Sequence, residues 1–392
     1  MPAPNHPPTS AADIVRPTRV EVDLGRLSAN LLAIRRRVGA VKVMPILKAN
    51  AYGHGLVEVA RHLVTIGVDY LGVGVLEEAI LLREQGIEAP ILVLGGIMEN
   101  QIPYFLDHGL TLTASSIGKL LQIDEAAAAT GTRARVHLKI DTGMERIGVH
   151  HYSAKEFLET SLRCRHCEIE GIYSHFASSE TADLTSARLQ LERFEAVLGF
   201  YEERSLATPW RHMANSGAIL QLPESHLDMV RPGLLLYGAY PSPDVPRTVP
   251  VCPALSWKSR VVYFKVVQAG NPVSYGWTWK PDRMVRVVTV PVGYGDGYFR
   301  ALSNSGVVII HGRRYPVVGR VCMDQVVVNI DWDSAYNGDE VVLIGESGNE
   351  SITCEELAER AGTIPYEVLT NISGRVPRVY VVPDSPGDTI RN

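Results

Sequence analysis

Residues 41–55 read VKVMPILKANAYGHG and join an apolar run to a glycine-rich loop. The run Val41–Leu47 has the length and composition of a strand that is buried on both faces. Lys48 follows it at once, so its amine would emerge at the end of the strand, and Gly53 and Gly55 would let backbone approach a bound anion. A lysine held in this way can form a Schiff base, although a lysine also commonly marks the polar end of a strand.

Seven further apolar runs follow up to residue 238, and helical patterns separate them. The runs are YLGVGV, ILVLG, LTLTA, RVHLKI, EIEGIYS, WRHMANS and MVRPGLLLYG. The stretches between them, such as LEEAILLREQG, carry apolar residues at the three- and four-residue spacing of helices. This alternation predicts parallel strands with crossover helices and favours a (β/α)8 TIM-type barrel, but a doubly wound sheet with an added half has the same rhythm.

Beyond residue 250 the pattern changes to β-branched runs separated by turn residues. SRVVYFKVV, MVRVVTVPV, GVVIIHGRRYPVVGRV, DQVVVNI and DEVVLIG follow one another without long helices, which predicts an antiparallel β domain. The segment TCEELAERAG is typical of a helix, and RVPRVYVV returns to strand. The predicted class is therefore α/β plus all-β, with a disordered tail at 1–16, a barrel at 17–250 and a β domain at 251–392.

The amino-acid composition argues against several classes of function. The 392 residues carry a formal net charge of −5, which gives no electrostatic reason to expect nucleic-acid or anionic-membrane partners. The sequence shows neither a secretory signal nor an apolar stretch of membrane-spanning length, so we expect a cytoplasmic protein. Five cysteines fit a reducing compartment, and the Cys164 and Cys167 pair lacks a second pair nearby, so no metal site is predicted.

Polar residues follow five of the predicted barrel strands. Barrel enzymes place their reactive groups at the carboxyl ends of the strands. Solvation or turn chemistry accounts for any one of these residues, but five clusters at strand exits of one barrel predict an active site. Those clusters are Lys48 with Tyr52; Lys139, Asp141 and Arg146; His175; His212, Asn215 and Ser216; and Arg231, Gly233 and Leu234. The last two segments also offer hydroxyl, amide and backbone donors suited to a phosphate.

From about residue 17 to 382 the chain resembles the alanine racemases. The strings that carry the resemblance include VMPILKANAYGHG, HLKIDTGMERIG, ANSGA, RPGLLLYG, VSYG, PVGYGDGY and GRVCMDQ, in this order. The resemblance implies a fold-type III enzyme that uses pyridoxal 5'-phosphate. It also implies a head-to-tail homodimer whose active sites combine residues of both subunits.

Racemisation needs two proton carriers on opposite faces of the substrate Cα. The resemblance makes Lys48 the Schiff-base lysine and the base on the D-face, and Tyr275 of the partner subunit the base on the L-face. A tyrosine beside a glycine turn more often packs than reacts. Because its ordinary pKa lies near 10, Tyr275 would need nearby positive charge to act as a base, and Arg146 and Arg231 are candidate sources.

Arg231 would bind the pyridine nitrogen of the cofactor, with His175 and His212 ordering its guanidinium. A guanidinium does not readily yield its proton, so it would donate a hydrogen bond and leave that nitrogen unprotonated. The cofactor would then be a weaker electron sink, which favours prompt reprotonation at Cα.

The resemblance assigns further roles. Phosphate binding falls to Tyr52, Ser216, Tyr366 and the backbone of Gly233 and Leu234, with Asn215 alongside. The substrate carboxylate would meet Arg146 and Met323 of the partner subunit, Tyr294 and Tyr366 would narrow the entrance, and Asp324 would support that wall. Lys139 matches a lysine that is carbamylated in some members and orients the neighbouring arginine. Glu145 departs from the family pattern, which often has glycine in DTGMxR.

The leading functional hypothesis is interconversion of L- and D-alanine, which supplies D-alanine for peptidoglycan. A racemase of another amino acid, such as serine or a longer basic one, is the alternative within the same chemistry, and bulky Tyr294 and Tyr366 favour a small substrate. A decarboxylase of basic amino acids fits less well, because Tyr275 and Arg231 match the racemase pattern. A non-catalytic pyridoxal-phosphate-binding protein would generally lack the β domain.

Overall fold

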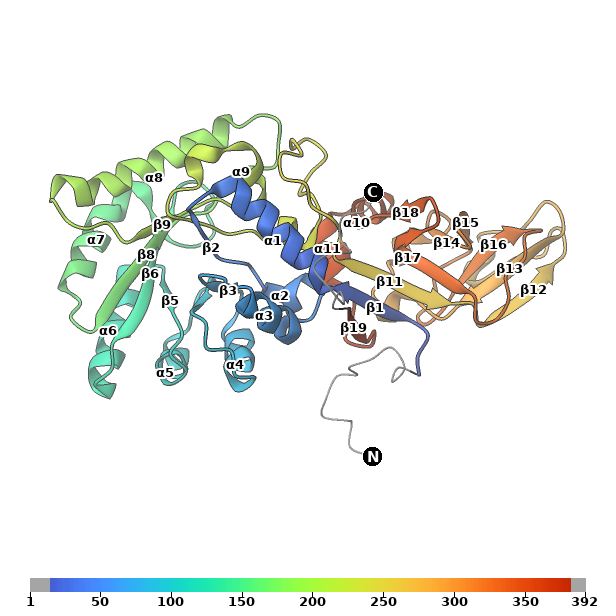
Figure 1. Ribbon diagram of the computed structural model, residues 1–392, viewed down its shortest axis with the longest axis horizontal. Helices are drawn as coiled ribbons and strands as arrows, with labels where there is room; N and C mark the ends of the chain where they lie inside the picture. Colours follow the sequence, from blue (N-terminus) through green and yellow to red (C-terminus); the bar gives the residue numbers. More distant parts are fainter. Residues whose placement is uncertain (1–14, 382–392) are drawn as a thin grey trace.

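The computed structural model describes residues 15–381. Most of the predicted tail, residues 1–14, lies outside this range, as do residues 382–392. Arg16, which the prediction placed in the tail, is instead held in an ion pair, with its Nη2 2.8 Å from Oδ2 of Asp296. Figure 1 shows an elongated molecule with a helix-rich part at one end and a β part at the other.

All eight apolar runs of the helix-rich part contain parallel strands, as predicted. Hydrogen-bonded ladders connect them in the order β2-β10-β9-β8-β6-β5, and β3 pairs separately with β4. Isolated bridges join Ile46 to Gly72 and Leu92 to Thr111, at the two places where these sheets meet. The strands are β2 (Lys42–Val43), β3 (Leu71–Val73), β4 (Ile91–Val93), β5 (Leu112–Ala114), β6 (Ala134–Asp141), β8 (Cys167–Tyr173), β9 (Trp210–His212) and β10 (Met229–Val230), with β7 (Val149–His150) pairing beside β6.

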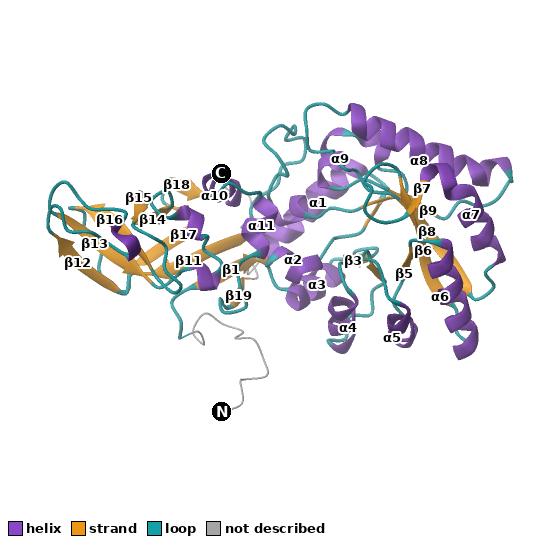
Figure 2. Cartoon of the chain, turned by 180° about the vertical axis from the view of Figure 1, so that it is seen from behind, coloured by secondary structure: helices purple, strands orange, loops and turns teal. Residues whose placement is uncertain are grey.

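Helices lie outside these strands (Figure 2). In α6 the Ser116 hydroxyl caps the first turn, and Leu120, Ile123 and Ala127 form the buried stripe at three- and four-residue spacing. No helix within residues 15–381 combines the length and the apolar character that a membrane span needs. The helices are α1 (Leu24–Val38), α2 (Lys48–Tyr52), α3 (Leu56–Thr65), α4 (Leu76–Glu84), α5 (Ile102–Asp107), α6 (Ile117–Thr130), α7 (Ala154–Arg163), α8 (Thr185–Glu203) and α9 (Ser216–Gln221).

The predicted antiparallel domain is present. Its strand order is β12-β13-β16-β15-β14-β17-β11-β1-β19, with β18 beside β17, and all pairs except β1 with β19 are antiparallel. Residues alternate between buried and partly exposed along β16, as expected for a sheet with one covered face. Its elements are β1 (Arg19–Asp23), β11 (Leu255–Arg260), β12 (Tyr263–Val267), β13 (Val285–Val290), β14 (Val307–Ile310), β15 (Arg313–Val318), β16 (Val326–Asp331), β17 (Glu340–Ser347), β18 (Glu350–Ile352), α10 (Cys354–Ala361), α11 (Pro365–Thr370) and β19 (Arg378–Val381).

Strand β1 differs from the predicted division of the chain, which grouped it with the barrel. It pairs antiparallel with β11 and parallel with β19, so it lies inside the C-terminal sheet. Its sequence RVEVD buries only Val20 and Val22 on alternate positions. That two-residue period belongs to a half-covered sheet, whereas the barrel strands β3, β4 and β5 are buried at every position. The chain therefore enters the helix-rich part only at α1.

Candidate active site

Lys48 follows a strand that is shorter than predicted. The regular ladder with β10 covers only Lys42 and Val43, but single backbone hydrogen bonds continue beyond it, from the N–H of Met44 to the oxygen of Val230 at 2.9 Å and from the N–H of Ile46 to the oxygen of Pro232 at 3.0 Å. Lys48 opens α2, whose next three residues have φ of +54°, +56° and +52°. Consecutive left-handed residues other than glycine are strained, so the packing around the turn must hold it.

The two glycines after this turn serve packing against the protein itself. A Cβ on Gly53 would collide with the backbone oxygen of Leu369, and a Cβ on Gly55 would collide with the hydroxyl of Tyr380. Both also have positive φ, of +80° and +102°. The close approach that the sequence suggested for an anion is therefore made by the C-terminal segment, which presses against the turn that carries Lys48.

One cavity gathers every barrel residue that the resemblance assigned to the cofactor, together with Tyr366 from α11. His212 does not line this cavity but lies directly behind Arg231. The cavity is lined by Lys48, Tyr52, Lys139, Arg146, His175, Asn215, Ser216, Arg231, Gly233, Leu234 and Tyr366, and by four residues not singled out from the sequence, Ile46, Leu94, Ile147 and Tyr173.

Arg231 is 4% exposed and is fixed from behind by hydrogen bonds. Its Nη1 lies 2.8 Å from Nδ1 of His212, and its Nη2 donates to the backbone oxygen of Ser174 at 2.7 Å and lies 3.2 Å from Nδ1 of His175. Burial lowers the pKa of Arg231 to about 10. Burial, followed by the charge of Arg231, also holds the pKa values of His175 and His212 well below the ordinary range. Both imidazoles are therefore neutral partners of a charged guanidinium.

The cavity concentrates positive charge. Burial, followed by the charge of Arg146, lowers the pKa of Lys48, while Glu78 acts in the opposite direction. Burial, followed by the charge of Arg231, lowers the pKa of Lys139 to about 7. Cations that lie near one another favour an anionic ligand, because it offsets their mutual repulsion.

At one end the cavity forms a cradle for an anion. The Ser216 hydroxyl oxygen accepts hydrogen bonds from the backbone N–H of Gly233 at 3.0 Å and of Leu235 at 3.2 Å, so its own proton is free to be donated to a ligand. A Cβ on Gly233 would lie 2.5 Å from the Tyr52 hydroxyl oxygen, so glycine at this position allows that hydroxyl to lie against the backbone. Burial raises the pKa of Tyr52, which keeps it a neutral donor. Asn215, by contrast, uses its side chain to cap α9.

The site residues predicted from the β domain lie elsewhere. Tyr275, Met323 and Tyr294 are 71%, 52% and 43% exposed, and none of them is among the residues that line the cavity. Tyr275 falls between β12 and β13, which lie at the end of the molecule remote from the barrel strands (Figures 1 and 2). Within one chain the predicted second base therefore lies outside the set of residues that line the cavity of Lys48.

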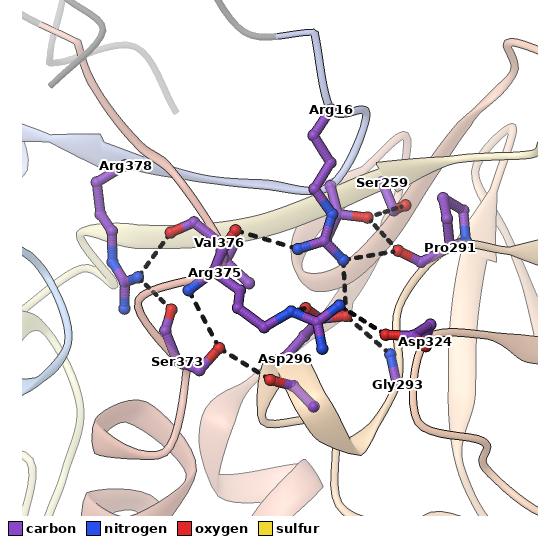
Figure 3. Close-up of polar contacts among 12 residues, drawn as sticks. Arg16, Ser259, Pro291, Gly293, Asp296, Asp324, Ser373, Arg375, Val376 and Arg378 are labelled. Carbon is purple, nitrogen blue, oxygen red and sulfur yellow. Dashed lines mark hydrogen bonds and ion pairs between the residues drawn. The ribbon is translucent and has the colours of Figure 1, made fainter. Parts of the chain in front are cut away.

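A buried carboxylate organises the loops that carry these exposed residues (Figure 3). Asp296 accepts from the backbone N–H of Gly293 at 3.1 Å and pairs with Arg375 at 3.5 Å, while Arg375 pairs with Asp324 at 2.6 Å. Because Asp324 directly follows Met323, Arg375 links the loop of Met323 to the loop of Tyr294. Asp324 therefore anchors its loop through Arg375, and its support of the entrance stays a prediction.

Comparison with known proteins identifies the family. The family model described as "Alanine racemase, N-terminal domain" matches residues 22–241, and the model "Alanine racemase, C-terminal domain" matches residues 254–380. The chain belongs to the alanine racemase family. The predicted family is confirmed, and with it the prediction of a racemase.

Relatives and solved structures in the alanine racemase family match over nearly the whole length. The alanine racemase of Carboxydothermus hydrogenoformans is 46% identical over 369 residues, which cover 94% of this chain and 100% of that protein. The alanine racemase of Chlorobaculum tepidum is 43% identical over 97% of each chain. The solved alanine racemase of Clostridium difficile 630 is 38% identical, with a TM-score of 0.90 over 95% of this chain and 98% of that one.

The departure from the alanine racemase pattern at Glu145 has a local structural consequence. Glu145 adopts φ of +53°, a left-handed conformation that glycine tolerates best, and its carboxylate lies 2.9 Å from Nε2 of His150. Asp141 nevertheless holds the loop, because it accepts from the backbone N–H groups of Met144 at 2.9 Å and Arg146 at 3.2 Å. Arg146 still lines the cavity.

Sequence reasoning missed some residues that this racemase places at or behind the cavity. Tyr173 lines the cavity, and its ring stacks on His212 with the centroids 4.8 Å apart. His137 lies behind His212. The period of two along a strand puts His137 on the same face as Lys139, so the string HLK contained a usable signal.

The cysteine pair outside the cavity lies near a carboxylate. One ligand atom each of Asp124, Cys164 and Cys167 lies within 4.8 Å of the others. Burial raises the pKa of both thiols, which favours the protonated form over the thiolate that binds metals. One carboxylate oxygen of Asp124 also accepts from the backbone N–H of His166 at 2.7 Å.

Proposed function

We propose that this member of the alanine racemase family interconverts L-alanine and D-alanine, using pyridoxal 5'-phosphate held in the cavity that contains Lys48. The observation that carries the proposal is the gathering of the Lys48 amine, a fixed guanidinium and a cluster of hydroxyl and backbone groups suited to an anion in one cavity. The cradle of Tyr52, Ser216 and Gly233 would hold the phosphate, and Arg231 would face the ring nitrogen.

The residues of the cavity fit that cofactor. The hydroxyl groups of Tyr52 and Ser216 both lie next to Gly233 at the cavity and supply donors of the kind that a phosphate requires. When bound, pyridoxal phosphate supplies an electron sink that stabilises negative charge at the substrate Cα. Arg231 would donate to the ring nitrogen without protonating it, because even its lowered pKa of about 10 keeps it charged near neutrality.

Lys48 is proposed to carry the proton on the D-face. Because burial and Arg146 lower its pKa, a larger fraction of the amine is neutral near pH 7 than for a free lysine, and only the neutral amine can accept a proton. Arg146 would bind the substrate carboxylate. Lys139, with a pKa of about 7, is nucleophilic enough near neutrality to take up carbon dioxide as a carbamate that orients Arg146.

The second base is proposed to be Tyr275 of the partner subunit in a head-to-tail homodimer. Tyr275 is 71% exposed and stands beside Trp277, which is 75% exposed, so this part of the β domain presents aromatic surface that a partner would cover. Met323 of the partner subunit would contact the substrate carboxylate through its backbone. Tyr294 and Tyr366 would narrow the entrance.

The proposal also covers the closure of the barrel, the domain boundary and the place of the protein in the cell. The two isolated bridges between the parallel sheets support a closed (β/α)8 barrel. We propose a boundary between the barrel and the β domain near residue 250, with β1 as a strand of the C-terminal sheet. The protein is proposed to act in the cytoplasm, to supply D-alanine for peptidoglycan and to bind neither nucleic acid nor membrane.

Of the two alternative functions, one is set aside by the family match and the other is left for the experiment to separate. A non-catalytic pyridoxal-phosphate-binding protein is set aside, because the chain matches the C-terminal as well as the N-terminal domain of the racemases. Racemisation of another small amino acid, such as serine, remains the competitor that the experiment must separate.

The test is deuterium uptake at Cα in heavy water by protein loaded with pyridoxal phosphate. L-alanine, L-serine and L-lysine would be given separately, with NMR detection and chiral analysis of the products. We expect exchange with D-alanine formation to be fastest for alanine. Faster formation of D-serine than of D-alanine would identify serine as the preferred substrate. Absence of exchange with all three amino acids would contradict the proposed function.

A further inference from the structure

The hydrogen bonds behind Arg231 continue through the interior of the barrel. His212 Nε2 lies 2.8 Å from Nδ1 of His137, and both imidazoles are fully buried. His137 Nε2 in turn lies 3.9 Å from Oε2 of Glu170, whose side chain is 16% exposed. The same carboxylate oxygen accepts from the hydroxyl of Tyr70 at 3.0 Å. A line of polar groups therefore runs from the cavity to a carboxylate on the far side of His212.

The direction of proton donation along this line is fixed at one end. A guanidinium only donates, so Nδ1 of His212 must accept from Arg231 at 2.8 Å. A neutral imidazole that accepts at Nδ1 carries its proton on Nε2, so His212 donates to Nδ1 of His137. His137 is then also protonated on Nε2, which faces Glu170 at an electrostatic rather than a hydrogen-bonding distance.

The surroundings support neutral rings in these orientations. Burial, followed by the charge of Arg231, lowers the pKa of His137 to about 3, so the ring stays neutral. A Cβ on Gly171 would lie 2.5 Å from Nδ1 of His137, so glycine at this position of β8 provides the room for the ring. The Tyr173 ring stacks on His212 with an interplanar angle of 6°, which holds the plane of that imidazole.

We propose that His137 and Glu170 are positioning residues that set the tautomer of His212 and thereby the orientation of Arg231 in the active site. A His212 ring protonated on Nδ1 would point an N–H at the guanidinium and push it away. His137 prevents this by giving the Nε2 proton its acceptor, and the Glu170 carboxylate attracts the second ring's N–H. The catalytic consequence rests on the proposed function, in which Arg231 faces the cofactor.

The first test needs no activity. ¹⁵N NMR of histidine-labelled protein, without and with pyridoxal phosphate, reports which ring nitrogen carries the proton. We expect His212 and His137 to be Nε2–H tautomers in both forms, with a coupling across their hydrogen bond. A wild-type His212 that carries its proton on Nδ1 would overturn the proposal whether or not the protein racemises alanine.

The second test compares two substitutions of one residue. His137→Asn keeps an acceptor oxygen near the position of Nδ1, whereas His137→Leu removes the acceptor. We expect His137→Leu to mix the tautomers of His212 and to lower kcat by roughly 10- to 100-fold, the usual range for lost partners of a site residue. His137→Asn should retain the Nε2–H tautomer and most of the turnover, and Glu170→Gln should have a smaller effect than His137→Leu.

A control separates positioning from loss of stability. Ser161→Ala removes a buried hydrogen bond of 2.7 Å to the backbone oxygen of Leu158 in α7 and should lower Tm without changing the His212 tautomer or kcat. If His137→Leu keeps both the tautomer and kcat, the proposal is wrong. If His137→Leu does not fold, the wild-type spectrum and the His137→Asn variant decide between the same two outcomes.

Discussion

The barrel and the β domain hold their site residues in opposite ways. In the barrel, Arg231 is 4% exposed and has four hydrogen-bonding partners on protein atoms, and it lines the same cavity as Lys48. In the β domain, Tyr275 is 71% exposed and is not among the residues that line that cavity. A cofactor site needs groups that are already fixed, whereas a residue that completes another subunit's site must remain on the surface. Within one chain the barrel half and the β-domain half of the proposed site therefore do not line one cavity.

The largest effect should come from the barrel half. Lys48→Ala removes the proposed base and the anchor of the cofactor, so racemisation should fall by about 10³-fold or more. D-alanine formation from L-alanine measures the loss. Lys42→Ala, at a partly exposed lysine of β2, is the matched control and should keep wild-type turnover. An active Lys48→Ala protein would break the assignment of the barrel half.

Loss of Tyr275 from the β domain should reduce turnover almost as much as loss of Lys48 and should not affect retention of the cofactor. Tyr275→Phe should lower kcat by roughly 10²- to 10⁴-fold, the range for loss of a general base, while pyridoxal phosphate stays bound. Tyr263→Phe, at another exposed tyrosine of the β domain, should be neutral. Equal turnover of wild type and Tyr275→Phe would exclude the two-base assignment.

Mixing the Lys48→Ala and Tyr275→Phe variants tests whether Lys48 of one subunit and Tyr275 of the other share one active site. A heterodimer of Lys48→Ala with Tyr275→Phe contains one site with both native residues, so random assortment of equal amounts should restore about a quarter of wild-type turnover. Each variant alone, mixed with itself, should stay inactive. Absence of recovery, with heterodimers verified by native mass spectrometry, would mean that Lys48 and Tyr275 do not share a site across the dimer.

Lowering the pH should reduce the stability of the barrel more than that of the β domain. Burial lowers the pKa of His54 to about 4 and of His137 to about 3, so between pH 6.5 and 4 the unfolded chain binds protons that the native state does not. Stability therefore falls as pH decreases through this window, by up to about 1.4 kcal/mol per pH unit for each such imidazole.

Thermal melts of the protein without cofactor between pH 7 and 5 measure this slope, and hydrogen exchange locates it. His54→Gln should make the slope shallower, because it removes one buried imidazole. His311→Gln in the β domain, where the imidazole is 55% exposed, should leave it unchanged. Identical slopes for wild type and His54→Gln would rule out the buried imidazoles as the cause.

The smallest expected effect concerns the loop of Arg146. Glu145→Gly relieves a left-handed backbone at φ of +53° and should change the free energy of unfolding by about 1 kcal/mol in the stabilising direction, with little change in turnover. Ser205→Gly, at another residue with φ of +53°, is the matched control and should stabilise similarly. A large fall in kcat for Glu145→Gly alone would show that the Glu145 carboxylate serves the site.

Sequence periodicity predicted all eight parallel strands of the helix-rich part, because continuous apolar runs mark strands that are buried on both faces. It did not place β1, since an alternating pentapeptide does not say which sheet it joins. It also misread Gly53 and Gly55, whose neighbours come from residues far along the chain. Contacts between distant segments leave little trace in local sequence.

By itself the sequence determined the alternation of strands and helices, the family and the set of polar residues at the strand exits, because these depend on spacing and residue type. Only the tertiary structure decided that β1 joins the C-terminal sheet, that Arg231 is backed by His212 and His137, and that Tyr275 stands outside its own chain's cavity. Such facts depend on which distant segments approach one another, and the packing of the whole chain sets those distances.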